Sequence, residues 1–266
     1  MELTFCPLFS GSSGNALLVA AGDTRILIDA GLSGRTVAQA LESVGVLPET
    51  LSGILVTHEH SDHVRGVGIL SRKYRIPVFA NEPTWNAMAR SVGEILPGCR
   101  RFFDTEGDFY IGELAVKPFA IPHDAAAPVG YRVYYGGRSL ATATDMGYFK
   151  KSVGQTIAGS DLVLLESNHD PDMLLSNPHY SSALKQRILS THGHMSNACC
   201  AEALCKLYAT GVKHIVLGHL SGENNTPELA MNTAIQKAVD DGLAPGQDIH
   251  IDMAWRDHVG SVYTIE

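Results

Sequence analysis

The sequence lacks the features that mark a membrane or secreted protein. Its 266 residues contain no apolar run near the eighteen or so residues that a membrane-spanning helix requires. Residues 1–6 have neither the basic nor the long apolar stretch of a signal peptide. We therefore expect a cytoplasmic protein that has no membrane partner.

The cysteine pattern also lacks the marks of a disulfide framework. The five cysteines are odd in number and include no C-x-x-C pair, which favours reduced and mostly buried thiols. They are Cys6, Cys99, Cys199, Cys200 and Cys205. Cys199 and Cys205 stand near residues considered below as site residues, so a thiolate ligand stays open as a weaker alternative.

Positive charge is scarce. The net charge of −8 argues against adhesion to nucleic acid or anionic membranes through overall charge. Two bound divalent ions would nevertheless add four positive charges locally, and could attract a phosphate-bearing substrate. The cations gather in four short clusters, which we interpret as solvated faces rather than DNA contacts: residues 72–75, 100–101, 150–151 and 185–187.

No low-complexity tract, charge block or Pro/Ser-rich linker divides the chain. We therefore predict a single domain over residues 1–266, with pseudo-repeat halves of roughly 1–130 and 131–266. Short apolar runs alternate with amphipathic stretches, as in a layered α/β fold, and two mixed sheets with helices outside would give αββα layers. The predicted strands are residues 2–7, 16–20, 24–29, 53–57, 77–80, 114–121, 130–135, 139–144, 162–166, 214–217, 248–252 and 261–265. Helices are predicted to begin near Ser33, His63, Pro83, Pro171, Ser181, Ser196 and Thr226.

The most informative motif lies at the end of the apolar run 54–56. His58, His60, Asp62 and His63 spell H-x-H-x-D-H. Imidazole nitrogens and carboxylate oxygens are the usual protein ligands of zinc and similar divalent ions. Four such groups within six residues are hard to explain as core filling, so the motif predicts a metal site.

Further polar residues follow later strands. His123 comes after the apolar run 119–121, Asp145 after the strand at 139–144, and His219 after the strand at 214–217. A lone histidine at a strand end is often structural, but here three such residues accompany the first motif. A different feature, the segment 10–15 (Ser-Gly-Ser-Ser-Gly-Asn), lacks the G-x-x-x-x-G-K-[ST] pattern of a nucleotide-binding loop. It either presents backbone N–H groups to a phosphate or forms a plain tight turn.

These motifs, in this order, resemble the metallo-β-lactamase superfamily over almost the whole chain. The resemblance implies two divalent ions, with zinc favoured and manganese or iron as alternatives. It assigns one ion to His58, His60 and His123, the other to Asp62, His63 and His219, and places Asp145 between the ions. Asp29, in the Leu27–Gly31 motif, would support the ligands through hydrogen bonds, or would otherwise be a turn carboxylate. Asp62 would also orient or deprotonate the attacking water.

Two further segments favour phosphodiesters as substrates. Residues 161–170 resemble the acidic motif of tRNase Z, in which a glutamate supports a catalytic histidine, and residues 194–198 resemble the matching histidine segment. In this chain the glutamate is Glu166 and the histidine is His194. Alternatively, Glu166 is a capping carboxylate and His194 is a solvated histidine. The resemblance extends to the YycJ-like (WalJ) branch, regarded as DNA exonucleases, through residues 8–16, 122–131, 166–170, 193–197 and 218–225. His169, His179 and His192 remain unassigned.

We therefore predict a dinuclear metal-dependent phosphodiester hydrolase that acts on nucleic acid, with DNA favoured over RNA. The predicted catalytic residues are Asp62, Glu166 and His194, with His194 as the acid for the leaving group and Glu166 as the carboxylate that orients it. A small-molecule cyclic phosphodiesterase and a thioesterase of the same fold stay open as alternatives. So does a metal-binding regulatory protein without turnover, and the oligomeric state is also left open.

Overall fold

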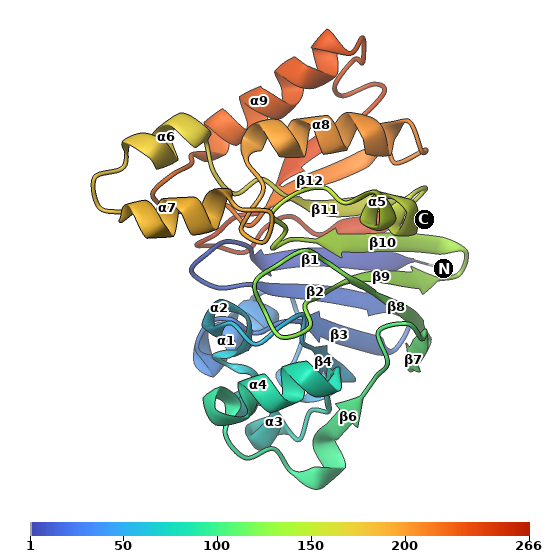
Figure 1. Ribbon diagram of the computed structural model, residues 1–266. Coiled ribbons are helices and arrows are strands. Elements are labelled where there is room, and N and C mark those ends of the chain that lie inside the picture. The colour runs from blue at the N-terminus through green and yellow to red at the C-terminus, as the bar shows by residue number, and fades with distance from the viewer. Residues whose placement is uncertain (1) are drawn as a thin grey trace. The chain divides into compact units, whose positions relative to one another are not determined.

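The strands form two mixed sheets of seven strands each, and helices flank them, as the sequence predicts. The computed structural model describes residues 2–266 (Figure 1). Contacts along the chain divide it into two compact units. The first comprises Met1–Ala120, Ala125–Arg138 and Trp255–Glu266, and the second comprises Ile121–Asp124 and Ser139–Ala254.

The first unit contains one complete seven-stranded sheet in the order β14-β1-β2-β3-β4-β5-β6. These strands are β1 (Leu3–Phe9), β2 (Ala16–Ala21), β3 (Thr24–Ile28), β4 (Gly53–Leu55), β5 (Val78–Ala80), β6 (Arg100–Phe102) and β14 (Tyr263–Ile265). Neighbours from β3 to β6 pair in parallel, whereas β14, β1, β2 and β3 pair antiparallel. The carboxyl ends of β3 and β4 therefore meet at one edge, where polar residues of the following loops gather.

Helices cover this sheet and close its core. They are α1 (Gly34–Ser43), α2 (Ser61–Val64), α3 (Val67–Tyr74) and α4 (Glu82–Val92), with two short 3₁₀ helices at Pro48–Thr50 and Pro97–Cys99. Ser33 and Asn81 cap α1 and α4 by accepting backbone N–H bonds. The apolar faces of these helices pack on the strands, with Val37, Leu70 and Met88 all fully buried.

Three antiparallel strands complete the first unit: β7 (Phe109–Ile111), β8 (Leu114–Ala120) and β9 (Val129–Tyr135). They pack against the seven-stranded sheet through aromatic rings. Phe109 stacks on Phe79 of β5 at 5.8 Å, and the buried Tyr131 hydroxyl donates to the carbonyl of Val56 at 2.6 Å. That carbonyl directly precedes the histidine motif, so the packing of β9 helps to fix the start of the motif.

The second unit contains four parallel strands in the order β13-β12-β11-β10, which are part of the other seven-stranded sheet, and helices lie along them. Its strands are β10 (Arg138–Ala143), β11 (Leu162–Glu166), β12 (His214–Gly218) and β13 (His250–Met253). Its helices are α5 (Lys151–Ile157), α6 (Pro171–Ser176), α7 (Ser182–Leu189), α8 (Asn197–Tyr208) and α9 (Pro227–Asp240). Figure 1 shows α8 and α9 side by side along the strands. The residues of β11 are all buried, as expected for a strand covered on both faces.

The structure differs from the sequence prediction in three elements that were not predicted and in one helix that is divided. β6, β7 and α5 were not predicted, because all three residues of β6 are exposed and the short β7 and α5 segments carry weak patterns. The helix predicted near His63 is two helices, α2 and α3, that meet at Gly66. A Cβ atom on Gly66 would lie 2.5 Å from the carbonyl oxygen of Leu32, so this close approach requires glycine.

Candidate metal centre

Strained backbone marks three of the predicted site residues. Four non-glycine residues among residues 2–266 have left-handed φ angles, and three of them are Asp29 (61°), Asp145 (60°) and His219 (56°). Asp29 and His219 directly follow β3 and β12, and Asp145 follows β10 by two residues. Left-handed angles are unfavourable for residues with a Cβ atom and persist where the surroundings enforce them. The turn at each strand end thus fixes the position of a metal-ligating type of side chain.

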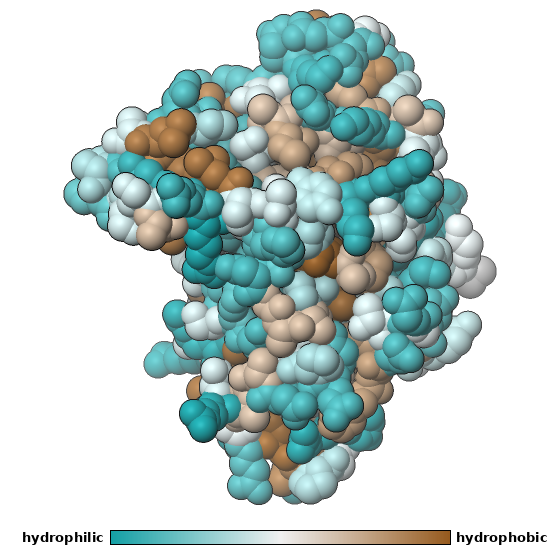
Figure 2. Space-filling view, viewed as in Figure 1, coloured by the Kyte–Doolittle hydropathy of each residue, from teal (hydrophilic) through white to brown (hydrophobic). Residues whose placement is uncertain are grey.

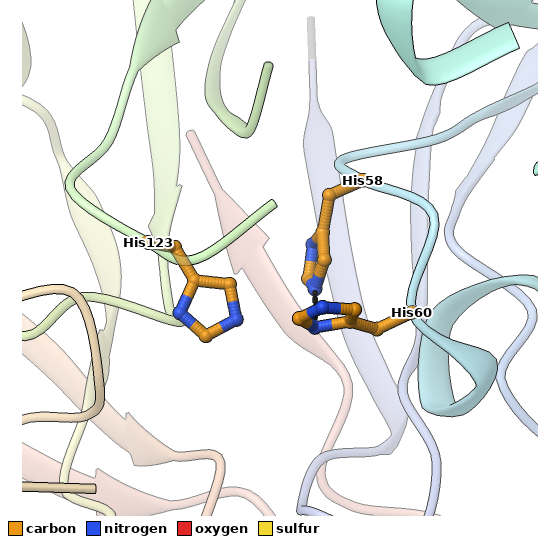
Figure 3. A group of neighbouring side chains, drawn as sticks. All are labelled: His58, His60 and His123. Atoms are coloured by element: carbon orange, nitrogen blue, oxygen red, sulfur yellow. Dashed lines mark hydrogen bonds between the residues drawn. The ribbon is translucent and has the colours of Figure 1, made fainter. Parts of the chain in front are cut away.

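In the first unit, the histidine motif occupies the loop after β4, which carries His58 and His60, and the helix α2, which carries Asp62 and His63. His58 is fully buried, and its Nε2 lies 3.1 Å from Nδ1 of His60 (Figure 3). The His63 ring is also buried, and its centroid lies 4.0 Å from that of His58. Asp62 is partly exposed, with Oδ2 3.4 Å from Nε2 of His63. The motif therefore brings imidazole nitrogens and a carboxylate oxygen together.

Asp29 fixes the orientation of these rings. Its carboxylate accepts hydrogen bonds from the backbone N–H of Thr57, from the Thr57 hydroxyl and from Nδ1 of His63, each at 2.8 Å. The Thr57 hydroxyl in turn lies 3.0 Å from Nδ1 of His58. These partners hold both Nδ1 atoms, so Nε2 of each ring is the nitrogen directed toward a ligand. Burial raises the pKa of the Asp29 carboxyl, whereas the neighbouring His63 opposes that rise.

Two positioning residues of the first unit were not recognised in the sequence. Thr57 is one, and Asn15 is the other. The Asn15 amide donates to the carbonyl of Asp62 at 3.3 Å and lies 3.2 Å from Nε2 of His63, while its oxygen accepts from Gly11 N–H. The segment 10–15 is therefore a turn that supports the histidine motif. A Cβ atom on Gly31 would lie 1.6 Å from the carbonyl oxygen of Asp62, which explains the glycine two residues after Asp29.

In the second unit, four predicted residues form another group. Ligand atoms of Asp145, Glu166, His194 and His219 all lie within 4.8 Å of one another. Nε2 of His219 lies 3.2 Å from Oδ1 of Asp145, and the rings of His194 and His219 stack at 5.2 Å. His123, which follows β8 and is also labelled in Figure 3, lies with this group, since its Nε2 is 3.9 Å from Oδ1 of Asp145. Its Nδ1 donates to the carbonyl of Gly193 at 3.1 Å.

Glu166 connects the loops that carry this second group. The carboxylate is fully buried at the end of β11. Oε1 lies 2.7 Å from Nδ1 of His194, and Oε2 accepts from the backbone N–H groups of Met146 at 2.7 Å and Met195 at 3.3 Å. One carboxylate thus holds the residue after Asp145, the residue after His194 and the His194 ring itself. Since its Nδ1 is held, His194 presents Nε2 to the site.

A buried cluster of amides and a hydroxyl supports the same loops, and the sequence prediction did not identify its function. Asn168 donates to the carbonyl of His219 at 2.9 Å. Asn225 donates to the carbonyls of Ser167 at 2.9 Å and Asn168 at 3.1 Å, and to Oδ1 of Asn197 at 2.8 Å. The Ser167 hydroxyl donates to Oδ1 of Asn197 at 2.7 Å. We call Ser167, Asn168, Asn197 and Asn225 the amide cluster; it joins the ends of β11 and β12 to the starts of α8 and α9.

The cysteines and the unassigned histidines lie in other settings. All five cysteines are free thiols, as predicted. Burial raises the pKa of Cys199, and it raises the pKa of Cys205 to about 11, which disfavours a thiolate ligand. His169 is buried, and burial lowers its pKa to about 4. His179 and His192 are exposed.

The chemistry of these donors fits divalent ions. In each unit, imidazole nitrogens and carboxylate oxygens gather within about 3–4 Å, a separation at which two donors can share one ion with bonds of about 2.0–2.2 Å. Oxygen and nitrogen donors without thiolate suit zinc, manganese and iron alike. The described residues 2–266 include no helix long and apolar enough to cross a membrane.

Comparison with known proteins defines the class. The model of the β-lactamase superfamily domain matches residues 24–220. The fold agrees: the metallo-β-lactamase-fold protein YhfI from Bacillus subtilis superimposes with a TM-score of 0.74 over 98% of this chain and 99% of that protein, at 15% identity. The chain therefore belongs to the β-lactamase superfamily, which confirms the predicted αββα fold class.

Closer relatives refine this placement within the superfamily. The exodeoxyribonuclease YycJ of Bacillus anthracis is 41% identical over 252 residues, covering 94% of this chain and 95% of the relative. The exodeoxyribonuclease WalJ of Streptococcus pneumoniae is 40% identical over 246 residues, covering 92% of this chain and 91% of the relative. The resemblance to this family that the motifs indicate is thereby confirmed.

Proposed function

We propose that the protein is a metal-dependent exodeoxyribonuclease that holds two divalent ions, preferably zinc. The proposed ligands are His58, His60 and His123 for one ion and Asp62, His63 and His219 for the other, with Asp145 shared. Each unit supports its part of the assignment, because its donors converge and their second nitrogens or oxygens are held by hydrogen bonds. The relatives named as exodeoxyribonucleases favour DNA as the substrate.

The observation that carries the phosphodiesterase assignment is the Glu166–His194 pair. A buried carboxylate 2.7 Å from Nδ1 stabilises the protonated imidazole and fixes its direction. His194 would then protonate the departing alkoxide of the phosphodiester through Nε2, a contribution worth roughly 10²–10⁴-fold. When bound, two ions would supply positive charge for the phosphate and lower the pKa of a bound water. Asp62, partly exposed beside His63, would orient that water.

The experiment that tests this proposal compares three substrates with the purified protein. We expect loss of nucleotides from the ends of linear DNA and hydrolysis of bis-p-nitrophenyl phosphate, both suppressed by a chelator and restored by Zn²⁺ or Mn²⁺. A glutathione thioester should react poorly. Strong thioester hydrolysis with inert phosphodiesters would instead identify a thioesterase. Cleavage of the model diester without any action on DNA would identify a small-molecule phosphodiesterase, and inactivity on all three after metal loading would favour a regulatory metal protein.

A further inference from the structure

A groove in the first unit lies between the amino-terminal end of α4 and the strand β6. It encloses about 550 Å³, a volume typical of ligand pockets, and its lining includes Asn81, Pro83, Phe102, Phe103, Asp104 and Ala127. Figure 2 shows hydrophobic atoms among hydrophilic ones over α4 and β6, in the lower part of the view. Apolar and polar surface thus alternate over these two elements.

One wall of the groove is an exposed aromatic ring that is nevertheless held in place. Phe102 is 57% exposed. Its ring packs at 5.9 Å on the buried Trp85, whose indole N–H donates to the carbonyl of Arg101 at 2.9 Å. The Arg100 guanidinium lies over both rings, at 4.8 Å from Trp85 and 5.4 Å from Phe102. A large ring that is both fixed and accessible provides a surface on which a planar group can stack.

The floor of the groove is equally rigid. Phe103 stacks on Phe109 at 5.0 Å and meets the edge of Tyr131 at 6.0 Å. Tyr131 is fully buried and donates to the carbonyl of Val56, two residues before His58. Packing therefore continues from the histidine motif to the groove within the same unit.

Hydrogen bonds make a second connection between the groove and the motif. The Asn81 amide donates to the carbonyl of Ala127 at 2.8 Å, and the neighbouring Ala126 N–H donates to Oε1 of Glu59 at 2.8 Å. Glu59 lies between His58 and His60 in the chain. Residues 126 and 127 thus contact both the groove and the loop that carries His58 and His60, so the groove is connected to the histidine motif within the same unit.

The distribution of charge selects the kind of group that enters. Carboxylates of Glu82 and Asp104 line the cavity, which disfavours a phosphate inside it but offers acceptors to the N–H groups of a nucleobase. Arg100 is exposed on β6 and lies over the Phe102 ring, where a phosphate can approach it, whereas Arg101 belongs to the opposite face of the strand.

We propose that this groove binds an unpaired nucleobase of the DNA strand, stacked on Phe102, with an adjoining phosphate on Arg100. The inference rests on the proposed nuclease function and adds a base-binding position away from the reacting phosphate. Rigid aromatic rings bordered by cations are the common means of holding single strands without reading their sequence. The position would keep an unpaired end directed toward the metal ligands.

The test measures binding of a fluorescent, phosphorothioate-linked oligo(dT) to the metal-loaded protein, to two variants of Phe102 and to one control variant. Phe102→Ala should weaken binding about tenfold, whereas Phe102→Trp should retain it, because stacking on an aromatic ring is worth roughly 1–3 kcal/mol per base. Tyr110→Ala provides the matched control, since Tyr110 is 75% exposed and does not line the groove. Hydrolysis of bis-p-nitrophenyl phosphate should stay unchanged in all variants, as this small diester does not reach the groove.

An abasic strand separates base stacking from a general change in structure. Wild-type protein and Phe102→Ala should bind a strand of abasic sites equally, since no base is present to stack. Equal binding of oligo(dT) by wild type and Phe102→Ala would overturn the base pocket. So would a Phe102→Ala variant whose affinity for the abasic strand falls as much as its affinity for oligo(dT). Failure of the wild type itself to bind or cleave DNA would instead overturn the proposed nuclease function.

Discussion

A single buried carboxylate determines how His194 can act. Glu166 holds Nδ1 of the ring at 2.7 Å, so only Nε2 is available to a substrate. We predict that His194→Ala lowers kcat for DNA by about 10²–10⁴-fold, the usual contribution of a positioned acid, with metal content unchanged. Hydrolysis of bis-p-nitrophenyl phosphate should fall far less, because p-nitrophenolate leaves without a proton. Steady-state kinetics on both substrates, together with metal analysis, makes the measurement.

His192→Ala is the control for this variant, because His192 is exposed two residues earlier and contacts Thr191. Its kinetics should match those of the wild type. Equal losses on DNA and on the model diester in His194→Ala would show a binding or structural role. Loss of metal in that variant would make His194 a ligand and overturn its assignment as an acid.

At the scale of elements, the amide cluster joins the segments that carry Glu166, His194 and His219. Asn225 makes three donor contacts in this cluster and is 6% exposed. We predict that Asn225→Ala lowers the free energy of unfolding by about 2–4 kcal/mol, because buried acceptors lose their donor. Urea denaturation followed by circular dichroism measures the change. The exposed Asn86 on α4 serves as control, and Asn86→Ala should change stability by less than about 0.5 kcal/mol.

Helices and strands could be predicted from the sequence where their signal is local. Strands with continuous apolar runs, such as β11, and helices with polar caps, such as α8 after Ser196, were predicted because their signals are local. β6 was missed because Arg100, Arg101 and Phe102 are all exposed on an edge strand. Its pairing with β5 depends on tertiary structure, which no local pattern reports.

The site residues also divide into those with a local sequence signal and those that act through contacts distant in the chain. The density of the histidine motif and the polar residues at strand ends drew attention to His58, Asp145 and His219 from the sequence alone. Asn15 acts through contacts 47 and 48 residues away along the chain, and the amide of Asn225 reaches residues 57 and 58 positions away. A lone asparagine in a turn carries no signal of such distant partners, so only the fold reveals these supports.

At the scale of the whole molecule, the proposed ligands are negatively charged or neutral groups of an acidic protein of net charge −8. Burial of the Asp29, Asp145 and Glu166 carboxylates costs free energy, because they lose their hydration. Nearby positive charge or hydrogen-bond donors must offset that cost. Asp29 and Glu166 have several N–H partners, and divalent ions would compensate the ligand carboxylates. Metal binding to the native protein alone should therefore contribute to folding stability.

We predict that the purified protein contains two divalent ions per chain and that a chelator lowers its melting temperature. Each ion present at a hundred times its dissociation constant would stabilise the fold by about 2.7 kcal/mol, which corresponds to about 5–10 °C for a chain of this size. Elemental analysis and calorimetry before and after chelation test both statements, and Zn²⁺ or Mn²⁺ should restore the transition. His60→Ala and His219→Ala should each reduce the metal content below two, whereas His214→Ala, outside the proposed ligand set, should not. Two ions retained in the first two variants would refute the ligand assignment, and an unchanged melting temperature after complete metal removal would refute the stabilising role.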